Sequence, residues 1–206
     1  RLVSAFKEEG IDCHKLWLLE GHGPEPTTLQ LSEQTINQSS NKSRFDLEGK
    51  LYRAVLAGQS GIAAELLKQG TNIQLPHFED LHFFNRELNS PAHLAAQKGY
   101  LRILKLLVES GADISRVNCH GETVLHHATR GGYAEIVDYC LAQGANINQQ
   151  DANGDTALAW ACYLGQWYIA TLLVENKADV NLSNHNGFTP LHWAAAKGFE
   201  PIVKLL

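Results

Sequence analysis

The sequence predicts an all-α fold, a solenoid of about five helix-turn-helix copies with short β-hairpin connections and a short irregular N-terminal segment. The first observation behind this prediction is a period of 33 residues, since Gly121, Gly154 and Gly187 each open a similar phrase. The second is an Ala-rich segment that follows each phrase and ends near a glycine. The third is a further segment in each copy with Ile, Leu and Val at helical spacing, such as Ile136 and Val137.

Composition limits the classes to which the protein can belong. The 206 residues are 44% hydrophobic and 19% charged, which is ordinary for a chain that buries a core. The formal net charge of -5 argues against the broad basic surface that phosphate binding requires, so we expect no nucleic-acid partner. The sequence has no signal-like start, no long apolar run and no closely spaced cysteine pair. We therefore expect a cytoplasmic location, with the nucleus as the alternative, and no membrane segment in this stretch.

Residues 1–45 do not follow the period and form the predicted N-terminal segment. Residues 15–20 are apolar enough for a buried strand or helix, and the Gly and Pro residues in 21–26 end either one. Residues 30–43 are rich in Gln, Asn and Ser, which is typical of a polar linker. Because the chain starts at Arg1 and stops inside a helical pattern, we interpret it as a fragment, and the end of another domain is an alternative for its first 45 residues.

The predicted repeat domain occupies residues 46–206. The phrase at 88–93 keeps the Ser, Pro and His positions of the later phrases, but Leu88 stands where they have Gly. From Gly58 to Gly99 there are 41 residues instead of 33, so we expect an insertion in the connection 74–89. The copies are predicted near residues 46–87, 88–120, 121–153, 154–186 and 187–206, the last one truncated.

Each helix pair has a composition that suits close stacking. The first helix carries small residues such as Ala128 and Ala194, which let neighbouring helices approach, and the second carries an apolar stripe. A glycine after the second helix suits the left-handed position at which many helices end. Lys177 replaces this glycine in the fourth copy, and we expect a weaker helix end there.

Three short motifs resemble the ankyrin-repeat family. They are Thr-Pro-Leu-His at 189–192, Gly-Ala-Asp at 111–113 and Gly-Ala-Asn-Ile-Asn at 144–148. The resemblance covers about three quarters of the chain. It implies a scaffold that binds another protein in a concave groove, with no enzymatic activity, no cofactor and no small-molecule substrate.

The motif histidines His93, His126 and His192 invite comparison with a metal site. In ankyrin repeats the Thr and His of this phrase tie the turn to the first helix by hydrogen bonds, as the resemblance implies here. Successive copies lie about 10 Å apart, whereas a metal ion needs ligands within about 2 Å of one point. We therefore expect a structural role for these histidines and no metal.

The position after each motif histidine faces the groove in the family. Large aromatic residues there are typical of interaction sites, although packing on the fifth copy or on flanking structure is an alternative. The fourth copy also has large groups at positions that are usually polar, and hairpin tips are expected to add specificity. The residues predicted to bind a partner are Leu94, His127, Trp160, Tyr163, Leu164, Trp167, Trp193, Arg116, Gln149, Leu182 and His185.

One short motif favours an enzyme. Residues 16–23, an apolar run followed by Gly-His-Gly, resemble the histidine-bearing strand end of caspase-like and toxin self-processing cysteine peptidases. Such a histidine acts with a cysteine nucleophile, but residues 23–50 contain no Cys, and Cys140 and Cys162 lie at apolar helix positions. We expect His22 to lie in a turn and assign no catalytic residue. The alternatives are a targeting arm of a larger enzyme, such as a cysteine peptidase whose catalytic domain lies outside this stretch, and the cytosolic part of a membrane protein.

Overall fold

The computed structural model describes residues 39–73 and 88–206. The chain divides into two units, residues 1–43 and residues 44–206, and the repeats belong to the second. Two predictions lie outside the described residues: the turn that contains His22, and most of the insertion expected at 74–89.

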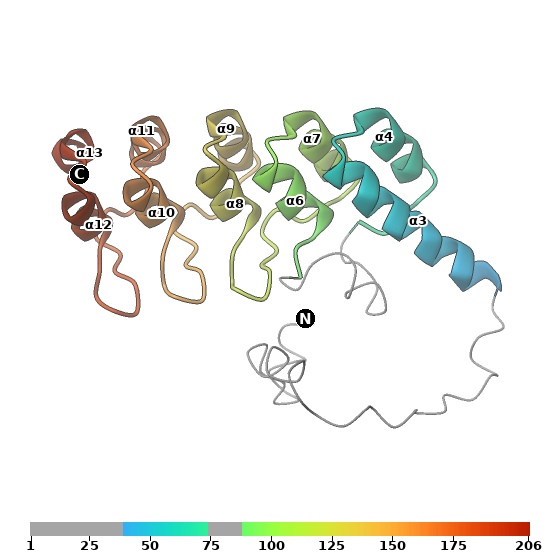
Figure 1. The fold of residues 1–206 in the computed structure, drawn as a ribbon, viewed down its shortest axis with the longest axis horizontal. Helices are drawn as coiled ribbons and strands as arrows, with labels where there is room; N and C mark the ends of the chain where they lie inside the picture. The colour runs from blue at the N-terminus through green and yellow to red at the C-terminus, as the bar shows by residue number, and fades with distance from the viewer. Residues whose placement is uncertain (1–38, 74–87) are drawn as a thin grey trace, which may run out of the picture. The chain divides into compact units, whose positions relative to one another are not determined.

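The described residues form helices in antiparallel pairs, which confirms the all-α solenoid. In Figure 1 the first helices of the pairs follow one another in one row and the second helices in another. The first helices are α3 (Ser39–Leu56), α6 (Pro91–Gln97), α8 (Val124–Gly131), α10 (Ala157–Tyr163) and α12 (Pro190–Lys197). The second helices are α4 (Ser60–Lys68), α7 (Leu101–Glu109), α9 (Ala134–Ala142), α11 (Trp167–Glu175) and α13 (Glu200–Leu205).

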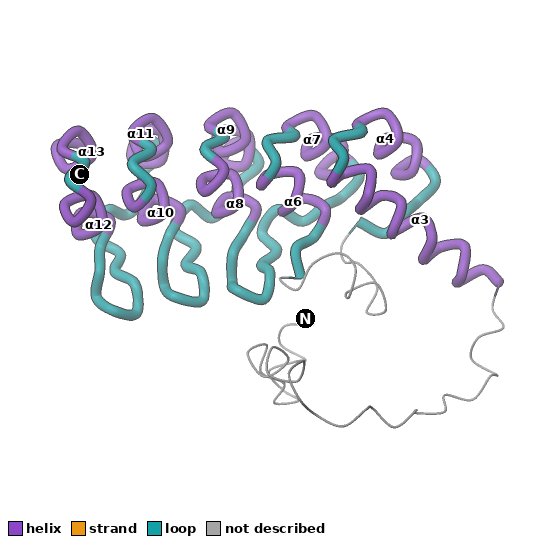
Figure 2. Tube along the Cα trace, viewed as in Figure 1, coloured by secondary structure: helices purple, strands orange, loops and turns teal. Residues whose placement is uncertain are grey.

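Long connections project from the row of first helices and turn back on themselves (Figure 2). Each is closed at its turn by a backbone hydrogen bond, for example from Asn118 N–H to Glu122 O at 3.0 Å and from Asp151 N–H to Asp155 O at 2.9 Å. Neighbouring connections are also joined, since Ala152 N–H donates to His120 O at 2.7 Å. The described connections therefore have the reversal expected of hairpins, with one isolated β-bridge and no regular strand.

The core consists of columns of residues one period apart. Ala95, Ala128, Ala161 and Ala194 are fully buried in successive first helices, as the stacking argument requires. In the second helices the matching column is Ile103, Ile136, Ile169 and Ile202. Burial of each isoleucine side chain contributes about 2 kcal/mol relative to exposure, so the stack is held mainly by contacts between adjacent copies.

A further contact between copies places an aromatic ring over the glycine that ends the previous first helix. The ring of Tyr100 lies 2.9 Å from the point where a Cβ of Gly58 would stand, and that of Phe199 lies 2.5 Å from the corresponding point at Gly165. Tyr133 covers Gly99 in the same way. These glycines are needed because a side chain there would collide with the ring of the next copy.

The structure bears on two features of the repeats that the sequence singled out. Lys177 does end its helix in the left-handed region, with φ of 66°, and Leu88 has φ of 54° where the later copies have Gly. The polar linker predicted at 30–43 is wrong over its last residues, because α3 begins at Ser39. The apolar helical period starts only near Leu47 and Leu51, which pack in the core, so the periodicity did not report the polar first turns of this helix.

Candidate partner-binding face

The motif histidines join the hairpin to the helix and one copy to the next. His93 Nδ1 accepts a hydrogen bond from Ser90 N–H at 3.1 Å, and His126 and His192 accept the equivalent bond from Thr123 and Thr189. With Nδ1 as acceptor, the ring proton is on Nε2, which in His93 lies 3.1 Å from Glu122 O. Burial is the main reason that the pKa of His93 falls to about 3. The expected structural role is confirmed for this turn.

We call the side of the stack formed by α3, α6, α8, α10 and α12 the helix-one face. The expected exposure of the column that follows the motif histidine is wrong at its first two positions. Leu94 is 3% exposed and His127 is 1% exposed, so neither side chain is available to a partner. Trp160 and Trp193 are half-buried.

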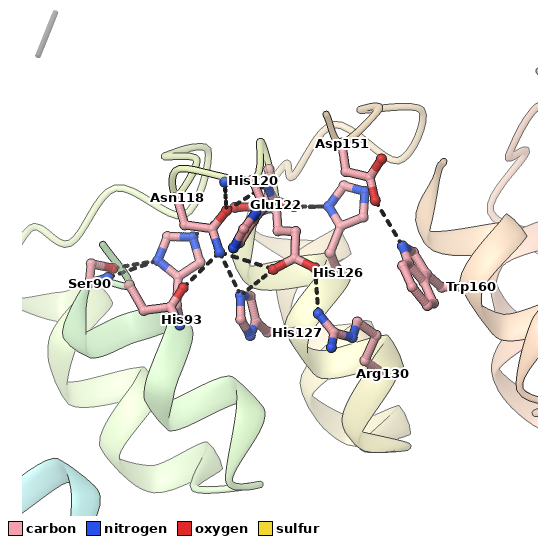
Figure 3. A network of polar contacts seen from close by, with 12 residues as sticks. Ser90, His93, Asn118, His120, Glu122, His126, His127, Arg130, Asp151 and Trp160 are labelled. Carbon is pink, nitrogen blue, oxygen red and sulfur yellow. Dashed lines mark hydrogen bonds and ion pairs between the residues drawn. The ribbon is translucent and has the colours of Figure 1, made fainter. Parts of the chain in front are cut away.

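His127 is buried because a polar network surrounds it (Figure 3). His127 Nε2 lies 3.2 Å from Glu122 Oε2, and Arg130 forms an ion pair with the other carboxylate oxygen. Asn118 Nδ2 donates to Glu122 Oε2 at 2.9 Å and to Asn89 Oδ1 at 2.8 Å. Burial alone would raise the pKa of Glu122, but the hydrogen bonds from His127 and Asn118, with the charges of His127 and Arg130, lower it to about 2. The Glu122 carboxylate therefore stabilises the fold by holding the side chains of His127, Asn118 and Arg130.

The two tryptophans are held by acceptors in a hairpin turn. Trp160 Nε1–H donates to Asp151 Oδ2 at 3.0 Å, a bond visible in Figure 3. Trp193 Nε1–H donates to Asp155 Oδ1 at 3.2 Å, across from the preceding copy. Asp151 is itself fixed, because its other oxygen accepts the backbone N–H of Asp155 at 2.9 Å. Both indoles therefore have a set orientation with their polar group satisfied.

The indoles belong to an aromatic cluster, defined here as Trp160, Tyr163, Phe188 and Trp193. Tyr163 meets Trp160 and Trp193 edge to face, with ring centroids 5.9 Å and 5.2 Å apart. Phe188 stacks on Trp193 at 5.1 Å and is 40% exposed. Such geometries are favourable for aromatic pairs. The sequence argument missed Phe188, although its position one period after Asp155 and two after Glu122 is polar in those copies, which was an available signal.

Two cations lie on the rings of this cluster. Arg130 Cζ is 5.1 Å from the centroid of Trp160, and Lys197 Nζ is 4.3 Å from the centroid of Tyr163. Both distances are within the range of cation–π attraction. The surface is thus aromatic and basic, a combination that the sequence argument did not anticipate.

The other predicted partner-binding residues lie outside the aromatic cluster. Leu164 ends α10 and is exposed, while Trp167 begins α11, is 51% exposed and makes no ring contact with the cluster among the described residues. At the hairpins His185 is exposed, and three residues are half-buried, namely Arg116, Gln149 and Leu182. The structure therefore brings together only Trp160, Tyr163 and Trp193 of the predicted set.

The thiols of the repeats differ in access. Cys140 and Cys162 are buried, as expected of core residues, and burial raises the pKa of each to about 12. Cys119 is half-buried, and Cys140 and Cys162 are free thiols. In the part of the chain that the structure describes, no group of three or more His, Cys, Asp or Glu side chains is arranged to hold a metal ion. No described helix is both long and apolar enough to cross a membrane.

Stacked helix pairs with side chains in columns define a repeat solenoid, and the helix-one face is one of its sides. A family model described as ankyrin repeats (3 copies) matches residues 51–151 and 132–206, and the chain belongs to the ankyrin-repeat family. Repeats of this family are generally protein-interaction modules.

Two curated relatives show local similarity. The chain is 41% identical over 46 residues to a transient receptor potential cation channel subfamily A member 1 homolog of Caenorhabditis elegans, which is 22% of this chain and 4% of that protein. It is 55% identical over 38 residues to the probable E3 ubiquitin-protein ligase XBOS33 of Oryza sativa subsp. japonica, which is 18% of this chain and 7% of that protein. The matches span little more than one period, so they reflect the repeat.

Proposed function

We propose that this chain binds a partner protein on the helix-one face and that the aromatic cluster supplies the main anchors. The observation behind the proposal is that Trp160, Tyr163, Phe188 and Trp193 from two adjacent copies form one partly exposed surface. Tryptophan and tyrosine are the side chains most often found as energetic hot spots of protein interfaces.

The cluster is organised before any partner arrives. The indole N–H groups of Trp160 and Trp193 are bound to Asp151 and Asp155, so these rings lose little freedom on binding. Ordering a flexible side chain at an interface costs about 0.5–1.5 kcal/mol, and this cost is reduced here. Preorganisation therefore supports recognition rather than a purely structural contact.

The enzyme-arm alternative uses the same face, because a targeting arm must also bind a protein. The free thiols of Cys140 and Cys162 agree with a reducing compartment, and we place the binding in the cytoplasm, with the nucleus as the alternative. The same binding experiment tests the proposal whether or not the chain is part of an enzyme and whichever compartment it occupies.

The test uses peptides selected from a random display library on the 206-residue chain. Phe188→Ala removes an exposed ring of the cluster, and we expect it to weaken the selected peptides about 30-fold, the effect of a hot spot of about 2 kcal/mol. Trp193→Ala should act in the same direction. Trp167→Ala is the matched control, since this aromatic residue is even more exposed than Phe188, lies outside the cluster and should leave affinity unchanged.

Melting temperatures of the three variants separate loss of binding from loss of folding. Trp160→Ala and Trp193→Ala are less decisive, because each ring is half-buried and bound to an aspartate, so stability should fall together with affinity. The proposal fails if Phe188→Ala binds as the parent chain does, or if Trp167→Ala weakens binding as much as Phe188→Ala does.

A further inference from the structure

From the second copy onward, charge is divided between the two rows of helices. α6, α8, α10 and α12, with their C-cap residues, contain no Asp or Glu and carry the cations Lys98, Arg130 and Lys197. In the first copy, Arg53 of α3 is exposed at the position that aligns with Leu94 and His127. The second helices contain more acidic than basic residues: Glu65, Glu109, Glu135, Asp138, Glu175 and Glu200 against Lys68, Arg102, Lys105 and Lys204.

The basic residues of the helix-one face differ in how far they are neutralised. Arg130 is paired with Glu122, so part of its charge is compensated. Lys98 and Lys197 stand at the same position of their copies, both are exposed, and neither forms an ion pair among the described residues. Lys197 lies directly on Tyr163, which places a positive charge beside the anchors of the aromatic cluster.

We propose that the partner segment is an acidic peptide chain in which carboxylates alternate with apolar or aromatic side chains. The inference rests on the proposed function and names the kind of partner that the helix-one face accepts. The carboxylates would meet Lys98 and Lys197, and the apolar side chains would lie on Phe188 and Trp193. The second helices carry more acidic than basic residues and repel a negative segment, so the helix-one face is the side to which such a segment is attracted.

The spacing of the cations favours a peptide over a nucleic acid. Lys98 and Lys197 are three copies apart, about 30 Å in a stack whose copies are about 10 Å apart. An extended peptide spans about 3.4 Å per residue, so acidic side chains about nine residues apart match these two lysines. A nucleic acid strand carries a phosphate about every 3.4 Å and needs a denser row of cations. The carboxylates of Asp151 and Asp155 at the base of the cluster further disfavour a polyanion.

The experiment measures binding of designed 15-residue peptides to the 206-residue chain by calorimetry. The acidic probe has Glu at every third position with Leu and Phe between, the second probe has Lys in place of Glu, and the third is single-stranded oligothymidine. We expect the acidic probe to bind best and to weaken with added salt. Lys98→Glu and Lys197→Glu should each weaken it about tenfold.

The matched control is Arg102→Glu, which makes the same change of charge on an exposed position of a second helix and should leave the affinity unchanged. The inference is overturned if the acidic probe does not bind, if the Lys probe or the oligonucleotide binds more tightly, or if Arg102→Glu acts as Lys197→Glu does. Phe188→Ala distinguishes the two proposals. If Phe188→Ala abolishes binding of a more tightly bound Lys probe, the aromatic cluster is the anchor and the proposed preference for an acidic peptide is wrong. If Phe188→Ala binds the acidic probe as tightly as the parent chain does, the proposed anchor role of the aromatic cluster is wrong.

Discussion

The end of each second helix shows what a single residue contributes to the repeat. Gly111 and Gly144 turn the chain in the left-handed region with φ of 96° and 83°, and Lys177 does so with φ of 66°. A residue with a Cβ is disfavoured there by roughly 1–2 kcal/mol. The fourth copy therefore retains the turn despite its side chain, because packing on both sides determines the backbone.

The first prediction concerns Lys177. Lys177→Gly should raise the free energy of unfolding by about 1 kcal/mol, since it removes the backbone strain while the added freedom of the unfolded chain offsets part of the gain. Urea unfolding followed by circular dichroism measures the change. Gly144→Ala is the reverse control: its Cβ would meet no atom within 4 Å, so a loss of similar size would isolate the backbone effect. Equal stability of Lys177→Gly and the parent chain would contradict this account.

The second prediction concerns pH and His93. The folded-state pKa of about 3 is below the usual value of 6.5, because the buried ring resists protonation. Above 6.5 the contribution of the neutral ring is complete. As pH falls from 6.5 towards 3, the unfolded chain takes up a proton that the folded chain does not, and stability decreases by about 1.4 kcal/mol per pH unit. Glu122 acts in the same sense from 4.5 to about 2.

Urea unfolding of the parent chain and of His93→Ala at pH 7.5, 6.0 and 5.0 checks this prediction. We expect His93→Ala to be about 2–3 kcal/mol less stable at pH 7.5, because Ser90 N–H and Glu122 O lose a buried partner. Its loss of stability between pH 7.5 and 5.0 should be smaller than that of the parent chain. A parallel pH profile in the two proteins would show that His93 does not carry the effect.

At the scale of elements, one of the junctions between copies lacks the aromatic ring that covers the glycine at the end of the preceding first helix. Where the other copies have Tyr100, Tyr133 and Phe199, the fourth has Gln166, whose Nε2 lies 3.6 Å from the point where a Cβ of Gly132 would stand. The Oε1 atom of Gln166 is buried with no hydrogen-bond partner. The junction between the third and fourth copies is thus less well satisfied than its neighbours.

The third prediction follows from this junction. Gln166→Tyr should raise the free energy of unfolding by about 1 kcal/mol, since it removes an unsatisfied buried oxygen and adds apolar contact over Gly132. Thermal unfolding measures it. The opposite exchange, Tyr133→Gln, should lower stability by a similar or larger amount. A less stable Gln166→Tyr would mean that the ring does not fit over Gly132.

The sequence predicts these elements because the same interface recurs every 33 residues. Contacts between neighbouring copies require residues such as Ala128, Ile136 and the glycine that ends each helix. These residues therefore recur in every copy, and a single sequence is enough to detect the pattern. The polar turns at the start of α3 carry no such pattern. Their helical state was therefore missed.

The candidate site was less predictable for a related reason. The burial of His127 depends on Glu122, Asn118 and Arg130, which are particular to one copy. The orientation of Trp193 depends on Asp155, 38 residues earlier. A repeat pattern gives the position of a side chain on its helix but not the partners that differ between copies. The aromatic column was thus predictable and its degree of burial was not.

At the scale of the whole repeat unit, contacts run mainly between adjacent helix pairs. α8 packs on α6 and α10, and α12 packs on α10 and α13. In such a linear array, stability is approximately the sum of the terms for each copy and each interface. An internal copy has two neighbouring interfaces, whereas the pair α12 and α13 contacts one described neighbour, α10 with α11.

The last prediction compares Ile136 and Ile202, which lie two copies apart in the same buried column, with Ile169 between them. Truncation to Ala should cost about 2–5 kcal/mol at either position. In Ile202→Ala the loss falls on one terminal pair, so amides of α12 and α13 should exchange with solvent much faster while those of α6 to α9 keep their protection. In Ile136→Ala two interfaces depend on the altered copy, so protection should fall in α6 through α11 together. Hydrogen exchange read by mass spectrometry distinguishes the two patterns, and uniform loss of protection in Ile202→Ala would show that the array unfolds as one cooperative unit.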